Sequence, residues 1–169
     1  MRVKILEVKS GALTNAEIRI GKDREMPSIH QNWRFNFDKH VKKLNSTGLV
    51  LVAEGTPNII EGCLIFEMKN KQIPYMAYVE AAPHNKGKER KYDYVAGCLI
   101  AFAFKQSLLK GKGDYKGMLF FDVQEREPLD QKKLMALYSN KYHAKALDET
   151  TMSIMDEDGQ KLIKEYLER

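Results

Sequence analysis

The run IPYMAYVEAAPHNKGKERKYDYVAGCLIAFAF, residues 73–104, determines how this sequence is expected to fold. Its first part, residues 73–82, is rich in the apolar and aromatic residues typical of a strand. A polar and basic loop follows over residues 84–91. Asp93, which is suited to cap a helix, then precedes a long apolar run with helical spacing. We expect a strand, a basic loop and a helix, and we expect this nearly all-apolar helix to pack in the core.

The segments on either side of this run extend it into a sheet. Residues 48–54 and 59–68 have the composition of strands, and turn signals separate them from each other and from residues 73–82. This close spacing predicts an antiparallel meander. Residues 116–123 are the next strand candidate, so the central strand, helix and strand predict a right-handed crossover between parallel strands.

The N-terminal part of the chain has a less regular pattern. Residues 2–9 roughly alternate and predict a first strand. Residues 12–33 have no clear assignment beyond a short apolar piece around Ile18 and Ile20. Residues 34–45 predict a helix, and its expected apolar face comprises Phe35, Phe37, Val41 and Leu44.

The C-terminal part predicts a helix, a strand and a helix. Pro128 can start a helix over residues 128–142. Residues 150–155 alternate as a strand does, and Asp156 is expected to cap a last helix over residues 157–168. The side chains expected to face the core are Leu129, Leu134, Leu137 and Tyr138 in the first helix and Leu162, Ile163, Tyr166 and Leu167 in the second.

The composition indicates a single folded domain over residues 1–169. The chain is 43% hydrophobic and 30% charged, as ordinary globular domains are. Cys63 and Cys98 lie in apolar runs and are expected to be buried thiols in a reducing compartment. No targeting segment is visible, and the longest apolar run, residues 94–104, is about half of the ~20 residues needed to span a bilayer. We therefore expect a cytoplasmic protein without a membrane segment.

The charge balance is mildly basic, with 28 Lys and Arg against 23 Asp and Glu. A basic loop that leads into a helix N-terminus suits an anion such as a pyrophosphate, although a loop that only solvates the chain has the same pattern. No Walker-type loop, dinucleotide fingerprint or zinc-protease motif is present. The four histidines are scattered, so no metal is expected.

The run from Ile73 to Phe104, with the segment MALYSNKY at residues 135–142, resembles the GNAT superfamily of acyl-CoA N-acyltransferases. The resemblance covers about residues 48–145, and the terminal strand and helix support it more weakly. It implies an α/β fold with a central mixed sheet flanked by helices. It also implies acetyl-CoA as co-substrate, whose pyrophosphate is held by the backbone amides of a loop of the form Gln/Arg-x-x-Gly-x-Gly/Ala before the long helix.

Lys91 to Ala96 align with this loop. Lys91 keeps a cation at the first position, Ala96 fits the last, and Tyr94 replaces the first glycine. We expect Tyr94 to have a negative φ and a ring turned away from the ligand, and Gly97 to relieve crowding. The resemblance implies that the coenzyme-binding residues are Val79, Ala81, Lys91, Tyr92, Asp93, Tyr94, Val95, Ala96, Gly97 and Gln131.

The chemistry that the resemblance implies is direct attack of an amine on the thioester, which needs a base and an acid. Glu80 stands at the position of the base, and alternation is expected to place it on one strand face with Tyr78 and Met76. Tyr138 aligns with the acid that protonates the leaving thiolate. The alternatives are a Glu80 that pairs with a nearby Lys and a Tyr138 that packs in the core. His84 is a second candidate base or a solvated loop residue.

Three aromatic residues, Trp33, Phe35 and Phe37, lie where members of the superfamily form part of the acceptor pocket. They are candidates for a lid over that pocket. Large aromatic side chains more often belong to the core, which is the alternative interpretation.

Two classes of function remain open. The first is an N-acetyltransferase that acts on a primary amine, such as a polyamine, an amino acid, a protein N-terminus or lysine, or an aminoacyl-tRNA. The second is a degenerate module that binds acyl-CoA or a partner without turnover. Other nucleic-acid binding is disfavoured, because a net charge of +5 is small and no stretch interleaves basic and aromatic residues. Members of the superfamily are often dimers, so the resemblance makes a homodimer one expected oligomeric state.

Overall fold

The computed structural model describes residues 1–22, 24–43 and 46–169 of the chain. Its first five long strands run antiparallel to their neighbours in sequence order. They are β1 (Arg2–Glu7), β2 (Leu13–Ile20), β3 (Ser46–Ala53), β4 (Ile60–Lys69) and β5 (Ile73–Ala81). The expected three-stranded meander is confirmed, and β1 and β2 extend it.

β2 is a strand that the sequence pattern left unassigned. Only Ala16 and Ile18 of its residues are buried, and Ile20 is 69% exposed. Two buried positions give a weak alternation signal. Pairing with β1 on one side and β3 on the other specifies this strand more than its own composition does.

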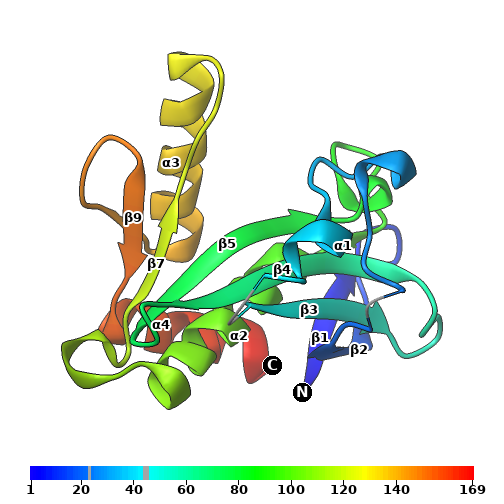
Figure 1. Cartoon of the computed structure of the whole chain (residues 1–169). Coiled ribbons are helices and arrows are strands. Elements are labelled where there is room, and N and C mark those ends of the chain that lie inside the picture. The colour runs from blue at the N-terminus through cyan, green and yellow to red at the C-terminus, as the bar shows by residue number, and fades with distance from the viewer. Residues whose placement is uncertain (23, 44–45) are drawn as a thin grey trace.

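The crossover from β5 passes through α2 (Val95–Lys110) and returns to β7 (Leu119–Asp122), which is parallel to β5. α2 lies against the sheet and most of its side chains are buried, so the expected parallel crossover and core helix are confirmed (Figure 1). Before α2 the chain forms a short strand that was not expected, β6 (Tyr92–Asp93), which pairs with β1. The start of α2 is thereby anchored to the β1 side of the sheet.

The C-terminal part contains α3 (Pro128–Tyr142), β8 (Lys145–Ala146), β9 (Thr151–Ile154) and α4 (Asp156–Leu162), which continues as a π-helical turn over Ile163–Leu167. The N-cap of α4 is Met155, so the expectation that Asp156 caps it is wrong. Leu129 is 70% exposed because the first turns of α3 project beyond the sheet (Figure 1), and Leu137, in a later turn, is 48% exposed. The expectation that these two leucines face the core is therefore wrong as well.

The expected helix over residues 34–45 is reduced to a single turn, α1 (Phe37–His40). Trp33 and Phe37 are buried and pack edge to face, with ring centroids 5.7 Å apart. This confirms the core interpretation for these two rings. Such packing holds the segment in place without a long helix. Leu44, expected on the buried face, lies outside the described residues.

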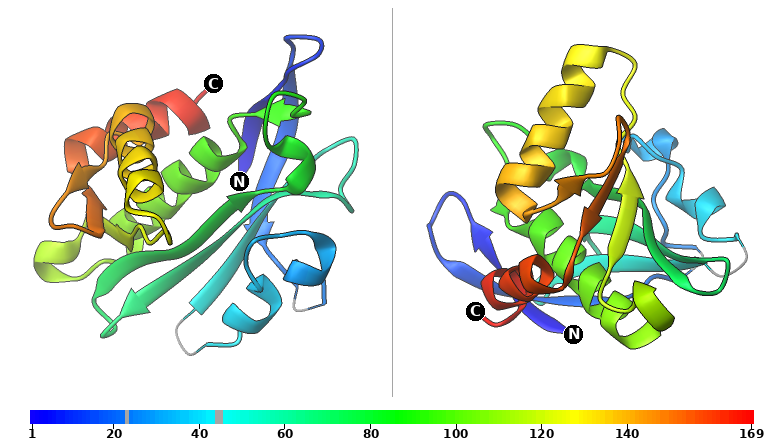
Figure 2. Two further views of the ribbon diagram at one scale, coloured as in Figure 1. Left: turned by 90° about the horizontal axis from the view of Figure 1, so that it is seen from above. Right: turned by 90° about the vertical axis from the view of Figure 1, so that its left-hand side faces the viewer.

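Over the described residues the strands form one sheet in the order β6-β1-β2-β3-β4-β5-β7-β9-β8. α2 and α4 pack on one face, and the α1 segment packs on the other (Figure 2). Cys63 and Cys98 are buried free thiols, as expected. In the described ranges no helix has the length and apolar character needed to cross a bilayer.

Candidate active site

A β-bulge in β5 opens the sheet beside β7. The pairing of β5 with β4 skips Ala77, which lies between Met76 and Tyr78. A bulge bends its strand and increases its twist. In the described chain β5 and β7 are paired only at Tyr75 and Phe120, before the bulge, and the two strands then diverge (Figure 1).

The bulge also changes which side chains share a face. Met76 packs on the α2 side of the sheet, whereas Tyr78 packs on the opposite side. The expectation that Met76 shares a face with Tyr78 and Glu80 is wrong, because simple alternation does not continue across a bulge.

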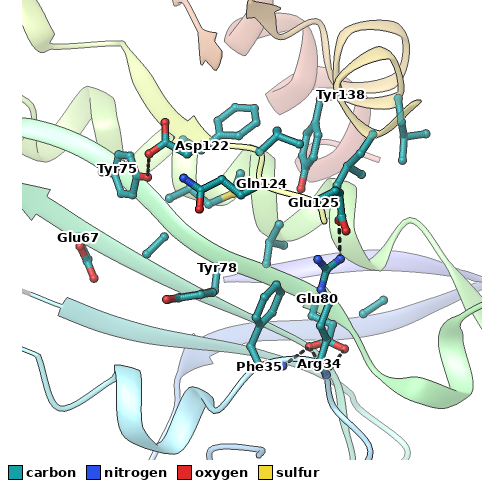
Figure 3. A pocket seen from close by; sticks show the side chains of 18 of the residues that line it. Arg34, Phe35, Glu67, Tyr75, Tyr78, Glu80, Asp122, Gln124, Glu125 and Tyr138 are labelled. Carbon is teal, nitrogen blue, oxygen red and sulfur yellow. Dashed lines mark hydrogen bonds and ion pairs between the residues drawn. The ribbon is translucent and has the colours of Figure 1, made fainter. Parts of the chain in front are cut away.

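The divergence of the strands leaves a cavity of about 780 Å³ between β5, β7, α3 and the segment before α1. The two expected catalytic residues, Glu80 and Tyr138, both line it (Figure 3). Its other charged lining residues are Arg34, Lys43, Glu67, Lys69, Lys86, Asp122 and Glu125. Its aromatic and aliphatic lining residues include Phe35, Tyr75, Tyr78, Phe121, Leu134 and Leu137.

β5 presents an open backbone edge to this cavity. The Ala82 N–H donates to the Glu61 carbonyl at 2.8 Å. Backbone groups alternate in direction along a strand, so those of Glu80, two residues before Ala82, also point toward β4. The backbone groups of Val79 and Ala81 then point the other way, toward the diverging β7. Both residues line the cavity. The strand positions expected to contact the coenzyme therefore lie at an open edge.

Glu80 is 6% exposed, and its carboxylate accepts hydrogen bonds on both oxygens. Oε1 accepts from the Arg34 N–H at 2.8 Å and from the Lys86 ammonium. Oε2 accepts from the Arg34 N–H at 3.1 Å and from the Phe35 N–H at 3.3 Å. The Arg34 N–H is shared between the two oxygens, so three donors occupy most of the about four acceptor sites of the carboxylate. Glu80 thus fixes the segment that carries Phe35 at the cavity wall (Figure 3).

Tyr138 extends from α3 with its hydroxyl directed toward Glu125 and the cavity (Figure 3). Its ring centroid lies 4.8 Å from that of Phe121. Burial raises the pKa of Tyr138 to about 12, against the opposing effect of the Arg34 charge. The phenol is therefore protonated at neutral pH and can donate a hydrogen bond into the cavity.

Two further pairs of residues line the cavity, and the sequence pattern did not identify either pair. Arg34 Nη1 lies 2.7 Å from Glu125 Oε1, and the Tyr75 hydroxyl donates to Asp122 Oδ2 at 2.7 Å. Asp122 ends β7, and ligands in open α/β sheets bind beyond the carboxyl ends of the strands, so its position in the sequence could have identified it as a site residue. Arg34 and Glu125 lie in distant segments, so no local sequence pattern indicates their pairing.

The basic loop is tied to the sheet by Glu61, a β4 carboxylate with no exposed surface. Glu61 Oε2 is hydrogen-bonded to His84 Nε2 at 2.6 Å and to Asn85 Nδ2 at 2.7 Å. Asn85 Oδ1 accepts from the Tyr92 N–H at 2.9 Å, which closes the loop at its other end. The His84 carbonyl also accepts from the Lys91 N–H at 3.0 Å. His84 is thus the partner of a buried carboxylate. It is not among the described residues that line the cavity with Glu80 and Tyr138.

Tyr94 rather than Asp93 is the N-cap residue of α2, and its φ of 72° is left-handed. The expectation of a negative φ is therefore wrong. The Tyr94 ring packs edge to face with Tyr166, and the Arg169 guanidinium lies 3.7 Å from its centroid. These contacts stabilise a backbone conformation that a glycine adopts at lower cost.

Asp93 accepts a hydrogen bond from the Tyr94 N–H at 2.7 Å and pairs with Arg90 at 3.0 Å and Lys141 at 3.6 Å. Partial burial alone would raise the pKa of Asp93, but the Tyr94 N–H and the two cations hold it below its usual range. A carboxylate therefore already sits among the cations at the start of α2.

The other residues expected at the coenzyme have separate locations. Lys91 is exposed, with its ammonium 4.8 Å from the Tyr92 ring centroid. Val95, Ala96 and Gly97 form the first turn of α2, whose N–H groups lack partners in a preceding turn. Gln131 donates to the Glu149 carbonyl at 2.7 Å. Neither the loop residues 91–97 nor Gln131 are among the described cavity-lining residues.

Solved structures share the fold of this chain, although no protein-family model and no curated protein matches the sequence. The spermidine N-acetyltransferase SpeG from Vibrio cholerae, solved in complex with CoA and spermine, aligns with a TM-score of 0.56 and 14% identity over 86% of this chain and 98% of that chain. An uncharacterized protein from Bacillus halodurans aligns with a TM-score of 0.60 and 9% identity over 97% of this chain and 95% of that chain. The chain has the fold of the GNAT N-acetyltransferases.

Proposed function

We propose that this protein is an N-acetyltransferase that transfers an acetyl group from acetyl-CoA to a primary amine. The observation that carries the proposal is the open edge of β5 beside a cavity that contains both Glu80 and Tyr138. An extended backbone edge can hydrogen-bond an extended ligand, as in strand addition. Support for the ligand class comes from SpeG, whose solved complex holds CoA and spermine.

The residues present suit the two ends of such a coenzyme. The Val79 and Ala81 backbone groups would hold the pantetheine arm at the cavity. The first amides of α2, at Val95 to Gly97, would hold the pyrophosphate, because a helix N-terminus binds anions. Lys91 adds positive charge at that end, and Arg90 and Lys141 are oriented there by Asp93.

Glu80 and Tyr138 would divide the proton transfers. The acceptor amine must lose a proton before it attacks the thioester carbonyl, and Glu80 is the carboxylate placed to accept it. The incoming amine would take the place that the Lys86 ammonium occupies on Oε1. The Tyr138 phenol would donate to the sulfur as the carbon–sulfur bond breaks, so that CoA leaves as a thiol.

A module that binds acyl-CoA without turnover is the second candidate. It is favoured by Glu80, whose carboxylate already accepts hydrogen bonds from the Arg34 N–H, the Phe35 N–H and the Lys86 ammonium and so is engaged in holding the chain. The same coenzyme titration separates the two candidates when it is followed by an assay for free thiol. An enzyme releases thiol when an amine is added, and a binding module does not.

The first test is calorimetric titration with acetyl-CoA of the wild-type protein and of Ala81→Pro. We expect micromolar binding by the wild type and at least tenfold weaker binding by the variant, because proline removes the N–H that faces the cavity. Stability should change little, since this N–H points away from β4 and proline is tolerated at an open strand edge. Equal affinities would show that the coenzyme does not use this edge, and no binding by the wild type at millimolar ligand would overturn the proposed function.

Replacing Glu80 by Gln is expected to lower kcat/KM for the amine at pH 7 by about a hundredfold, within the range for loss of a general base. Glu67→Gln, which changes a second cavity carboxylate, is the matched control. A wild-type kcat/KM in Glu80→Gln would show that Glu80 only holds Arg34 and Phe35 in place and does not act as the base.

A further inference from the structure

Lys86 belongs to the exposed basic loop, yet its ammonium is directed to the cavity and pairs with Glu80. Its side chain is 44% exposed, whereas that of Glu80 is 4% exposed. Among the described residues of the loop, Lys86 alone lines the cavity. This pair places a primary amine of the chain on the carboxylate proposed as the base.

The loop is built to hold Lys86 in this position. A 3₁₀ turn, η2 (Pro83–Asn85), directly precedes it, and the Lys86 N–H donates to the Pro83 carbonyl at 3.3 Å. Asn85, the neighbouring residue, is buried and bonded to Glu61 through its side chain. The backbone of Lys86 is thus fixed to β4 while its side chain remains free to extend along the cavity wall.

We propose that Lys86 occupies the place of the acceptor's amino group and is itself acetylated, so that the protein modifies its own loop. The inference rests on the proposed function, because it uses the same coenzyme and the same base. A lysine amine on a flexible four-carbon stem is chemically equivalent to the primary amine of a small acceptor.

The reaction balances with the groups on the cavity wall. The Lys86 ammonium gives one proton to Glu80, and the free amine attacks the carbonyl carbon of the thioester. A nitrogen–carbon bond forms, the carbon–sulfur bond breaks, and Tyr138 supplies a proton to the leaving sulfur. The second proton lost by the nitrogen restores Tyr138, and Glu80 releases its proton to water. The products are Nε-acetyl-lysine, free CoA thiol and one proton.

Acetylation would also change the site. It removes the positive charge of Lys86 and with it the ion pair to Glu80. An external amine then no longer competes with an internal ammonium for the same carboxylate.

The test is incubation of the folded protein with isotopically labelled acetyl-CoA, followed by mass spectrometry of chymotryptic peptides. We expect Lys86 to be labelled at least tenfold faster than Lys88 and Lys91 of the same loop. Lys43 and Lys69, which also line the cavity, are the controls for simple proximity. The rate constant should not depend on protein concentration, since the transfer is within one chain, and it should fall at least tenfold in Tyr138→Phe.

A second measurement does not depend on turnover. Removing the ammonium in Lys86→Met should let n-butylamine bind at Glu80 at least tenfold more tightly than it binds to the wild-type protein. The backbone amides of Arg34 and Phe35 report this by NMR, because both donate to Glu80. Lys88→Met, which changes an amine outside the cavity lining, should bind n-butylamine as the wild type does.

The outcomes separate this inference from the proposed function. If acetyl-CoA binds and Lys86 is labelled no faster than Lys88, self-acetylation is wrong and the acetyltransferase proposal stands. Preferential labelling of Lys43 or Lys69 overturns it in the same way. If the folded protein does not bind acetyl-CoA, the proposed function fails and the inference that rests on it fails too.

Discussion

Replacing Tyr138 by Phe is expected to lower kcat for acetyl transfer about a hundredfold, while the dissociation constant for acetyl-CoA stays within twofold. The magnitude is at the lower end of what a positioned proton donor contributes. The substitution removes only the hydroxyl, and the ring that packs against Phe121 is kept. Steady-state kinetics with an external amine and calorimetry with acetyl-CoA measure the two quantities separately.

Tyr142→Phe is the matched control for this prediction. Tyr142 lies one turn further along α3 and is buried, but it is not among the described cavity-lining residues. Its loss of a hydroxyl should leave kcat unchanged. Because burial raises the pKa of Tyr138 to about 12, the wild-type rate should also show no loss from its ionisation between pH 7 and pH 10. Equal kcat values in wild type and Tyr138→Phe would remove Tyr138 from the mechanism.

The central strand, loop and helix were predictable because each has a local signal. The turn residues divide the strands, and the apolar run after Asp93 is too long and too evenly apolar for an exposed helix. The bulge at Ala77 has no such signal, because residues 76–79 are a continuous apolar and aromatic run, which an uninterrupted strand has as well. The bulge lies where β5 parts from β7, so the shape of the cavity could not be derived from the strand pattern alone.

The sequence indicated individual residues of the candidate site, each within its own helix or strand. Glu80 and Tyr138 were identified separately, and the structure places both at one cavity. The contacts that fix Glu80 come from Arg34 and Phe35, 46 and 45 residues away in sequence. No local pattern indicates such contacts, since they depend on how the segment before α1 folds over the sheet. Likewise, Tyr94 holds a left-handed conformation through Tyr166 and Arg169, at the far end of the chain.

Gly97 illustrates how a position assigned to ligand binding has a packing role. A Cβ built on Gly97 would lie 2.2 Å from Cε1 of Tyr166 and 2.6 Å from its Cζ. Tyr166 is 2% exposed, and its ring also packs against Tyr94 and Tyr142, which limits its movement. The absence of a side chain at Gly97 is what allows the C-terminal helix to approach the first turn of α2.

Replacing Gly97 by Ala is therefore expected to lower the free energy of unfolding by about 2 kcal/mol, the cost typical of overpacking a core. For a chain of this size that corresponds to a fall in Tm of roughly 4–8 °C, measured by thermal unfolding. Alanine is otherwise the better helix former by up to about 1 kcal/mol, so without the clash the sign reverses. The same substitution in a Tyr166→Ala background should accordingly be neutral or stabilising. If Gly97→Ala costs the same in both backgrounds, contact with the Tyr166 ring is not the cause, and the glycine serves the backbone at the start of α2 instead.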